Sequence, residues 1–258
     1  MIKNLIKPFY RIFVSLFFDP FEFIKKLRGL PLYLSDLFLY KKAQNNTVFP
    51  AKFSNIYPIL NDRFELAGTA SGIYFLQDLW AAKYLYDNNI RYHVDVGSRI
   101  DGFIAHILPF CQVEYVDIRS LQSKINNLKF RKGSITDLPF NSESIKSLSC
   151  LHVIEHIGLG RYGDPIDPSG YLKGAKELSR VLAHGGLLLL STPVGKEKLY
   201  FNAHRVFDPY TIIKIFDELK LIEFNFIDDK GEKIIHNADL KDATKYTYGC
   251  GLFVFTKD

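Results

Sequence analysis

The segment His152-Val-Ile-Glu-His156 brings two imidazoles and one carboxylate together within five residues. Such groups can transfer protons, and the spacing H-x-x-E-H also occurs in zinc-binding helices. A zinc site would need both histidines on one face of a sustained helix. Here an apolar strand precedes the segment and Ile157-Gly-Leu-Gly160 ends any helix, so we predict no metal site. Glu155 and His156 are then either catalytic residues or anchors of a turn.

A second group of polar residues, Asn202, His204 and Arg205, follows a continuous apolar strand. Ligands bind beyond the carboxyl ends of strands in open α/β sheets. We therefore predict His204 as a general base and Arg205 as a contact to an anion or a sugar. The alternative is that both only stabilise the fold. Asn202 and, in an upstream turn, Asp164 are further predicted substrate contacts.

The elements that would position these residues begin with a short buried strand, Tyr92–Val96. A tight loop, Gly97–Gly102, then leads into a helix. A strand that turns through glycines into a helix is the first unit of a doubly wound sheet, and its free N–H groups can bind a nucleotide or another anion. Asp117 ends the next strand, 22 residues after Asp95, where a carboxylate can accept hydrogen bonds from ribose hydroxyls.

Strands and helices continue to alternate along the chain, which predicts an α/β fold with a parallel sheet. The further predicted strands are Leu128–Arg131, Ile145–Leu151, Leu187–Thr192, Leu221–Ile227 and Leu252–Thr256. The further predicted helices begin at Asp167-Pro168 and at Asp208-Pro209.

Several segments share a characteristic order and spacing: Asp95-Val-Gly97, Asp117, Asp137-Leu-Pro-Phe140, Leu151–His156, Gly185-Gly186 and the strand that ends at Pro193. Together they resemble the class I S-adenosylmethionine-dependent methyltransferases. Four more segments carry a closer likeness: Tyr74–Trp80, His93–Gly102, Gly163–Pro168 and Phe201–Phe207. Through these the chain is similar to a bacterial methyltransferase-like family of unknown function.

The resemblance implies a Rossmann-like, seven-stranded sheet of order 3-2-1-4-5-7-6 with the last strand antiparallel. It implies S-adenosylmethionine as the cofactor. It also implies roles for matching residues: Asp95 and Gly97 at the methionine end, Asp117 at the ribose, Asp137 at the adenine amino group, His152 beside the transferred methyl group, and Ser98, Arg99, Gly102 and Ile118 as further cofactor contacts.

The loop after the first strand departs from the methyltransferase pattern, which has three glycines at alternate positions. Arg99 and Asp101 occupy the second and third positions, and Gly102 is displaced by one. The side chain of Arg99 could crowd the cofactor or pair with its carboxylate.

Three functions remain open. The first is methyl transfer to a small molecule or a cell-surface glycan precursor. Its glycan part follows from a likeness of Leu27–Tyr33 to segments that precede glycan-associated methyltransferases. The second is a non-catalytic binding module with an altered cofactor loop. The third, a nicotinamide-dependent oxidoreductase, lacks the G-x-G-x-x-G motif.

The 258 residues predict a domain over residues 91–258, preceded by a connector over 47–90 and a basic, aromatic-rich helical extension over 1–46. The extension holds eight basic and three acidic residues, so it accounts for the whole net charge of +5. This distribution argues against a nucleic-acid groove on the main domain.

The extension is expected to contain helices broken at Gly29-Leu-Pro31. Its first part, residues 1–18, has too short an uncharged run to span a bilayer. It either packs against the domain or a second subunit, giving a homo-oligomer, or lies in a membrane interface with its basic face toward the headgroups. Three widely spaced cysteines fit a reducing, cytoplasmic compartment.

Overall fold

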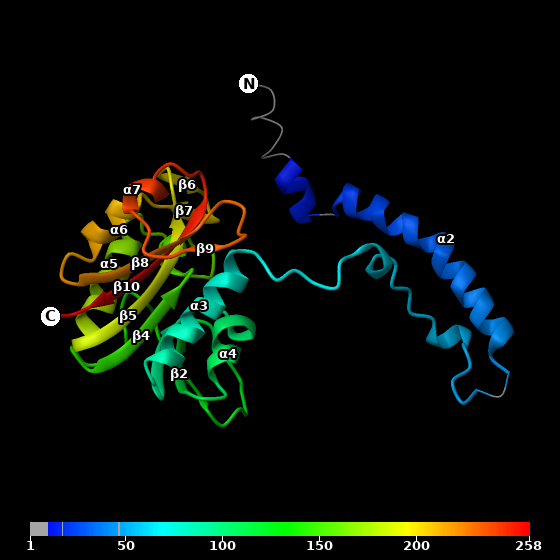
Figure 1. Cartoon of the computed structure of the whole chain (residues 1–258), viewed down its shortest axis with the longest axis horizontal. Coiled ribbons are helices and arrows are strands. Elements are labelled where there is room, and N and C mark those ends of the chain that lie inside the picture. The colour runs from blue at the N-terminus through cyan, green and yellow to red at the C-terminus, as the bar shows by residue number, and fades with distance from the viewer. Residues whose placement is uncertain (1–9, 17, 46) are drawn as a thin grey trace, which may run out of the picture. The chain divides into compact units, whose positions relative to one another are not determined.

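A computed structural model describes residues 10–16, 18–45 and 47–258 (Figure 1). The chain divides into two compact units, with the boundary between Thr69 and Ala70. Most of the segment predicted to meet a membrane or a partner, residues 1–18, lies outside the described residues.

The first unit is built on one long helix, α2 (Pro20–Ala43). Asp19 caps it by accepting a hydrogen bond from the Phe21 N–H (2.8 Å), and Pro20 occupies its first turn, where no hydrogen-bond donor is needed. The predicted break at Gly29-Leu-Pro31 is wrong, because the helix continues through Pro31 and loses only the hydrogen bond that a proline nitrogen cannot donate. Two 3₁₀ turns follow, Phe53–Asn55 and Asp62–Phe64.

The second unit contains an eight-stranded sheet of order β3-β2-β1-β4-β5-β10-β8-β9. Its strands are β1 (Tyr92–Val96), β2 (Gln112–Asp117), β3 (Leu128–Lys132), β4 (Ile145–Leu151), β5 (Leu182–Val194), β8 (Lys220–Ile227), β9 (Ile234–Ile235) and β10 (Gly249–Thr256). A separate hairpin pairs β6 (Lys198–Tyr200) with β7 (His204–Val206).

The strands from β3 to β5 pair in parallel, and β10 pairs antiparallel with both β5 and β8. With the two-residue edge strand β9 set aside, this is the predicted order 3-2-1-4-5-7-6 with an antiparallel last strand. The predicted fold class is confirmed.

Helices cover both faces of the sheet (Figure 1). One face carries α3 (Ile73–Asp87) and the short turns Ile100–Ile104 and α4 (Ala105–Ile107). The other carries α5 (Gly170–Val181), α6 (Pro209–Ile215) and α7 (Leu240–Ala243). The compact unit begins upstream of residue 91 because α3 packs its apolar side, including Trp80 and Leu85, against Phe103 and Ile107.

The alternation of strand and helix is incomplete on one side of β1. Residues 118–127 and 133–144 are all described, and none of them is helical. The connections to and from β3 are therefore irregular loops, and each begins at the carboxyl end of a strand. They provide polar groups there that a regular helix would have kept in its own hydrogen bonds.

The loop between β4 and α5 is shaped by glycines and by one carboxylate. Asp164 accepts hydrogen bonds from the N–H groups of Gly158 (2.7 Å), Gly160 (3.3 Å) and Tyr162 (3.2 Å). Gly158 has a φ of 79°, and a Cβ there would lie 1.8 Å from the Asp167 carbonyl oxygen. The loop therefore folds over itself so closely that only glycine fits.

This packing predicts different costs for two substitutions in the same loop. Gly163 also has a positive φ (85°), but nothing lies within 4 Å of its missing Cβ. Gly163→Ala should cost about 1 kcal/mol of unfolding free energy through backbone strain alone, whereas Gly158→Ala should cost about 3 kcal/mol or more because the backbone must also move. Urea unfolding of both variants measures the difference. Equal losses of unfolding free energy would contradict the close contact between Gly158 and the Asp167 carbonyl.

Candidate functional site

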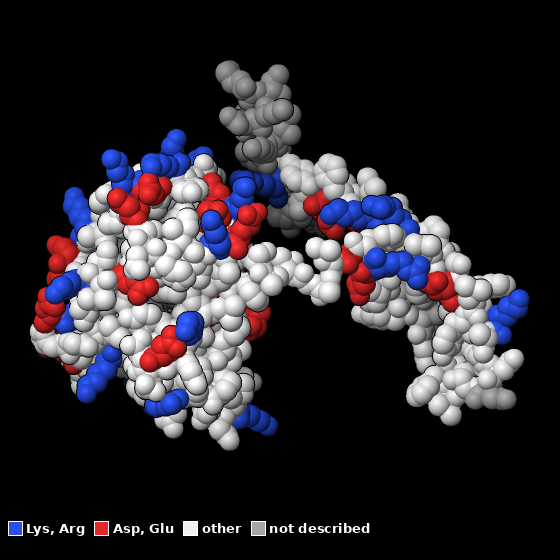
Figure 2. Space-filling view, viewed as in Figure 1, with Lys and Arg blue, Asp and Glu red and all other residues white. Residues whose placement is uncertain are grey.

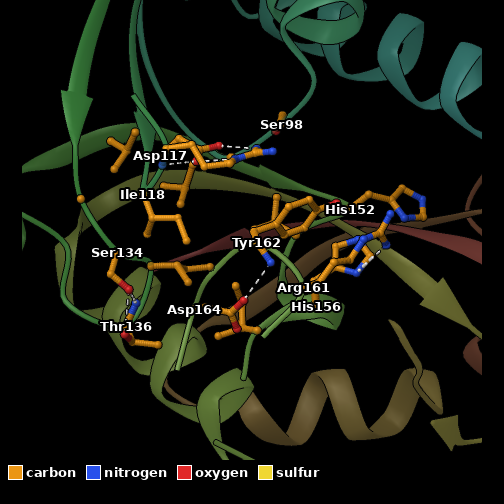
Figure 3. Close-up of a pocket in the computed structure, with 18 of the residues that line it drawn as sticks. Ser98, Asp117, Ile118, Ser134, Thr136, His152, His156, Arg161, Tyr162 and Asp164 are labelled. Atoms are coloured by element: carbon orange, nitrogen blue, oxygen red, sulfur yellow. Dashed lines mark hydrogen bonds and ion pairs between the residues drawn. The ribbon is translucent and has the colours of Figure 1, made fainter. Parts of the chain in front are cut away.

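A cavity of about 640 Å³ opens where the carboxyl ends of β1, β2 and β4 meet (Figure 3). This is where the strand order reverses, the usual position of ligand sites in open α/β sheets. Its walls come from the loops that follow β1, β2, β3 and β4, together with Tyr74 from the first turn of α3. The volume suits a ligand of nucleotide size.

The loop after β1 forms the floor of the cavity and is anchored from below. Asp95 is fully buried and accepts hydrogen bonds from the Ser98 N–H (2.9 Å), the Ser98 hydroxyl (2.5 Å) and the Ser149 hydroxyl. Burial raises its pKa to about 6, although the bonds from Ser149 and Ser98 oppose the rise. Gly97 and Ser98 line the cavity, whereas Asp95 lies outside its lining.

Two side chains occupy the altered glycine positions. The Arg99 guanidinium donates two hydrogen bonds to the Asp101 carboxylate (3.2 and 3.1 Å) and lies 5.1 Å from the centre of the Tyr74 ring. Both charged residues line the cavity and are largely exposed. Arg99 is therefore held at the side of the cavity by a carboxylate and an aromatic ring.

Gly102 lies outside the lining and has a packing role instead. A Cβ there would stand 2.2 Å from the Asp78 Oδ2 atom, and its carbonyl accepts a hydrogen bond from His106 Nδ1 (2.6 Å). Asp78 is buried beneath the loop, and burial raises its pKa. The glycine allows this carboxyl group to approach the backbone.

Asp117 ends β2 in the lining of the cavity, and its carboxylate already has four partners. Oδ1 accepts from the Arg119 N–H (2.8 Å) and Nε (3.0 Å), and Oδ2 accepts from Arg119 Nη2 (2.7 Å) and the Tyr115 hydroxyl (3.0 Å). Burial opposes its charge, yet the bonds from Arg119 hold the pKa of Asp117 below its usual value. The Arg119 guanidinium also lies 4.5 Å from the centre of the Tyr162 ring.

The loop after β3 presents hydroxyl groups to the cavity. Ser134 and Thr136 line it, as does Ile118 from the loop after β2. Asp137 does not, because the turn that joins its N–H to the Ser134 carbonyl (3.0 Å) leaves it exposed. The sequence pointed to the correct loop but to a residue that faces solvent.

His152 and Glu155 form a buried pair directly after β4. His152 Nδ1 donates to Glu155 Oε1 (2.7 Å), and both side chains are at most 3% exposed. Burial would lower the pKa of His152, but Cys250 and the Glu155 carboxylate raise it well above its usual value of 6.5. Within the described residues, the buried Nε2 atom of His152 has no hydrogen-bond partner.

The backbone of His152 is also unusual, with a φ of 54°. A left-handed conformation at a residue other than glycine costs about 1–3 kcal/mol and often occurs at functional sites. The backbone N–H of His152 bonds to both the carbonyl (3.0 Å) and the hydroxyl (3.1 Å) of Ser191 in β5. These bonds hold His152 in the cavity lining.

His156 lines the cavity beside this pair. Its Nδ1 donates to the Ala203 carbonyl (2.6 Å), while its Nε2 lies 3.7 Å from Glu155 Oε1. Burial lowers the pKa of His156, which favours the neutral ring. Arg161 donates to the same Ala203 carbonyl (3.0 Å) and lines the cavity as well.

The remaining predicted residues do not converge on the cavity. His204, Asn202 and Arg205 all lie outside its lining. Arg205 binds the loop before α5 by donating to the carbonyls of Ile157 (2.7 Å), Glu155 (3.3 Å) and Pro168 (3.4 Å). Asp164 lines the cavity, but its carboxylate accepts three bonds from its own loop.

Three residues of the lining were not predicted from the sequence: Arg119 and Tyr162, which contact each other, and Tyr74, which contacts Arg99. One signal was available for Arg119, since an arginine two residues after a strand-end aspartate can pair with it. Among the described residues, no group of three or more His, Cys, Asp or Glu side chains could hold a metal ion.

Comparison with known proteins identifies the family. The profile described as "Caenorhabditis protein of unknown function, DUF268" matches residues 113–253, more than half of the chain. The chain belongs to this family. The match fits the predicted methyltransferase-like family of unknown function. No curated protein matches the sequence.

Solved structures share the fold of this family member at low sequence identity. One is Burkholderia thailandensis 1,6-didemethyltoxoflavin-N1-methyltransferase with bound 1,6-didemethyltoxoflavin and S-adenosylhomocysteine (TM-score 0.52, 12% identity, 93% of this chain and 91% of that chain). Another is a putative sarcosine dimethylglycine methyltransferase from Galdieria sulphuraria (TM-score 0.51, 14% identity, 70% of this chain and 85% of that chain). A third is the [4+2]-cyclase SpnF (TM-score 0.51, 11% identity, 69% of this chain and 80% of that chain). Since one of the three is a cyclase, the shared fold does not fix the reaction.

The His152–Glu155 pair predicts a pH-dependent stability. The pKa of Glu155 is lowered from 4.5 and that of His152 is raised from 6.5. Their stabilisation is therefore complete between pH 4.5 and 6.5. It is lost as the pH falls through the folded-state pKa of Glu155 or rises through that of His152.

Glu155→Gln should cost about 3–5 kcal/mol in that window, because it leaves a buried imidazolium without a counter-charge. The cost should shrink at alkaline pH, where the imidazole is neutral. The double variant His152→Gln/Glu155→Gln should recover part of the loss. Urea unfolding at several pH values tests this, and a cost independent of pH would show that the pair is not charged.

Proposed function

We propose that the protein transfers a methyl group from S-adenosylmethionine to a small acceptor molecule. One observation carries the proposal. In a fold shared with methyltransferases, a single cavity at the point of strand-order reversal is lined by Gly97, Asp117 and His152. These residues come from three different strand ends, and the resemblance assigns all three to one ligand.

The residues present fit this cofactor. Asp117 would bind the ribose hydroxyls, which would take the place of the Arg119 donors. Arg119 is about half exposed, so its side chain can leave without disturbing the core. Gly97, with no side chain and a φ of 74°, lets a ligand approach the backbone. Ser134 and Thr136 offer hydroxyl groups to the adenine end.

When bound, S-adenosylmethionine supplies a methyl group carried on a positively charged sulfur. The chain must then orient an acceptor, exclude water and remove a proton from an oxygen or nitrogen nucleophile. We assign His152 rather than His204 as the base, since His152 lines the cavity and His204 does not. Glu155 holds Nδ1 protonated, so the buried Nε2 atom is the position that accepts the proton once the ring is neutral.

The acceptor is a small molecule or a cell-surface glycan precursor. A cavity of about 640 Å³ that also holds the cofactor leaves room for a compact acceptor or for one end of a longer one. Arg161 and Tyr162 lie in the lining next to His156. They offer the acceptor a cation and an aromatic ring.

A second candidate function is a non-catalytic binding module. The two arginine–aspartate pairs favour it, because Arg99 with Asp101 and Arg119 with Asp117 bring charged side chains to the places expected for the methionine and ribose parts of the cofactor. If these pairs do not open, the cavity cannot take S-adenosylmethionine.

Two matched substitutions test whether Asp117 binds the cofactor. Both Asp117 and Asp101 line the cavity and pair with an arginine two residues away. Asp117→Asn should weaken S-adenosylhomocysteine binding by about tenfold or more, since it removes charge-assisted hydrogen bonds to the ribose. Asp101→Asn should change the affinity by about twofold at most.

Calorimetric titration of the native protein and both variants measures these affinities, with NAD as a competing nucleotide. Absence of S-adenosylhomocysteine binding to the native protein would exclude the methyltransferase. Equal effects of the two substitutions would exclude Asp117 as the ribose contact.

The base assignment predicts a pH profile. The raised pKa of His152 keeps the imidazole protonated near neutral pH, so the rate should increase with pH through an inflection above 6.5. Glu155→Gln should move the inflection to lower pH by removing the carboxylate. His152→Gln should lower the rate by about 10²–10⁴-fold, and His204→Gln should have little effect.

The rates are measured as S-adenosylhomocysteine release with an acceptor found by screening nucleotide sugars, glycan intermediates and other small molecules. A profile that Glu155→Gln leaves unchanged would contradict the role of His152.

A further inference from the structure

Helix α2 has one side covered by the chain that follows it. The missing Cβ of Gly29 would lie 1.9 Å from the Leu60 carbonyl oxygen, so residues near 60 lie directly against the helix. Arg63 pairs with Asp36 at 2.7 Å, and Arg28 lies 5.1 Å from the centre of the Phe64 ring. These contacts fix which side of the helix is used within the first unit.

The opposite side of α2 is apolar and exposed, and further exposed apolar residues occur elsewhere on the helix, among them Phe21, Ile24 and Leu39. The residues of the opposite side follow the helical repeat at i, i+4, i+7, i+11 and i+15: Phe23, Leu27, Leu30, Leu34 and Phe38. Each is between 39% and 68% exposed, and Gly29 is the one residue of the helix that is buried in the described structure. We call these five residues the apolar face. Isolated exposed leucines are ordinary, but a continuous row of this length marks an interaction surface.

The charges of α2 are arranged around the apolar face. The helix carries five basic and two acidic residues, and Figure 2 shows its lysines and arginines in blue. Glu22 pairs with Lys25 and Asp36 pairs with Arg63, so both acidic groups already have a cation. Lys26, Lys41 and Lys42 form no ion pair with any described residue.

The apolar face could contact either a second copy of the helix or a membrane surface, and the position of Lys41 and Lys42 favours the membrane. They follow Phe38 at i+3 and i+4, so they continue the apolar face at its C-terminal end. In a dry contact with a second copy of the helix, two adjacent lysines would have to be desolvated. At a membrane surface they reach the phosphate groups while their alkyl stems stay in the apolar layer.

We propose that α2 lies in the interface of an anionic membrane, with the apolar face toward the acyl chains. The unpaired lysines bind the headgroups. No helix in the described part of the chain is long and apolar enough to cross a bilayer, so the contact is peripheral. The proposal rests on the first unit alone and does not depend on the reaction of the second.

The test is co-sedimentation of the full chain with lipid vesicles. The protein should bind vesicles that contain phosphatidylglycerol and bind pure phosphatidylcholine vesicles much less. Lys41→Gln/Lys42→Gln should weaken partitioning by roughly fivefold for each lysine removed. Leu27→Asp/Leu34→Asp should weaken it by about tenfold or more.

The control is Val48→Asp/Leu66→Asp, which adds the same charge at residues of the same unit that are 83% and 86% exposed but lie outside the helix. It should keep most of the binding, and circular dichroism confirms that each variant is folded. Absence of binding to anionic vesicles would overturn the proposal, as would equal losses in the two aspartate variants. A dimer in light scattering that Leu27→Asp/Leu34→Asp dissociates, without vesicle binding, would assign the apolar face to a second copy instead.

Discussion

The buried carboxylate of Asp95 joins the two strand ends that form the floor of the cavity. It accepts from Ser98 in the loop after β1 and from Ser149 in β4, and the Ser98 hydroxyl in turn accepts from the Leu151 N–H (3.1 Å). Because the Ser149 hydroxyl donates to Asp95, it must accept from His93 Nε2 (2.7 Å). Ser147 then donates to His93 Nδ1 (2.7 Å), and burial keeps that ring neutral by lowering its pKa to about 3. A continuous set of hydrogen-bonded polar groups thus runs through the core and fixes the position of the loop after β1.

The charged residues above this floor are held by contacts of unequal strength. Arg99 and Arg119 each pair with an aspartate on the cavity wall, and the arginine side chains are at least half exposed. The exposed Arg99–Asp101 pair contributes about 1 kcal/mol or less. The Asp117 carboxylate is buried and bound more firmly, so a ligand replaces the Arg119 side chain only by giving Asp117 hydrogen bonds of its own. Asp95 and the backbone of Gly97 stay fixed in either case.

Much of the fold could be predicted from the sequence, because apolar runs and glycine turns directly reflect strand burial and chain reversal. The strand order and the family were confirmed. No helix was predicted next to β3, and residues 118–127 and 133–144 are indeed not helical. The helix continues through Pro31, and beside it Gly29 lies against the backbone of Leu60, which is far along the chain and not indicated by the local sequence.

The site residues were harder to predict for a different reason. Sequence spacing places a residue at a strand end, but it does not say whether the side chain faces the cavity or the core. Asp95 and Asp117 both belong to strand ends, yet the first is an anchor below the loop and the second lines the cavity. His152 was placed near the reacting group, but its pairing with Glu155 involves a left-handed backbone conformation that the residue type does not predict.

A crystal structure of the protein with S-adenosylhomocysteine would test the proposed cofactor site most directly. We predict that the ribose hydroxyls bind the Asp117 carboxylate, that Arg119 has moved away from it, and that the thioether lies beside His152. A ligand bound elsewhere, or Arg119 still paired with Asp117 while the cavity stays empty at saturating ligand, would contradict this prediction.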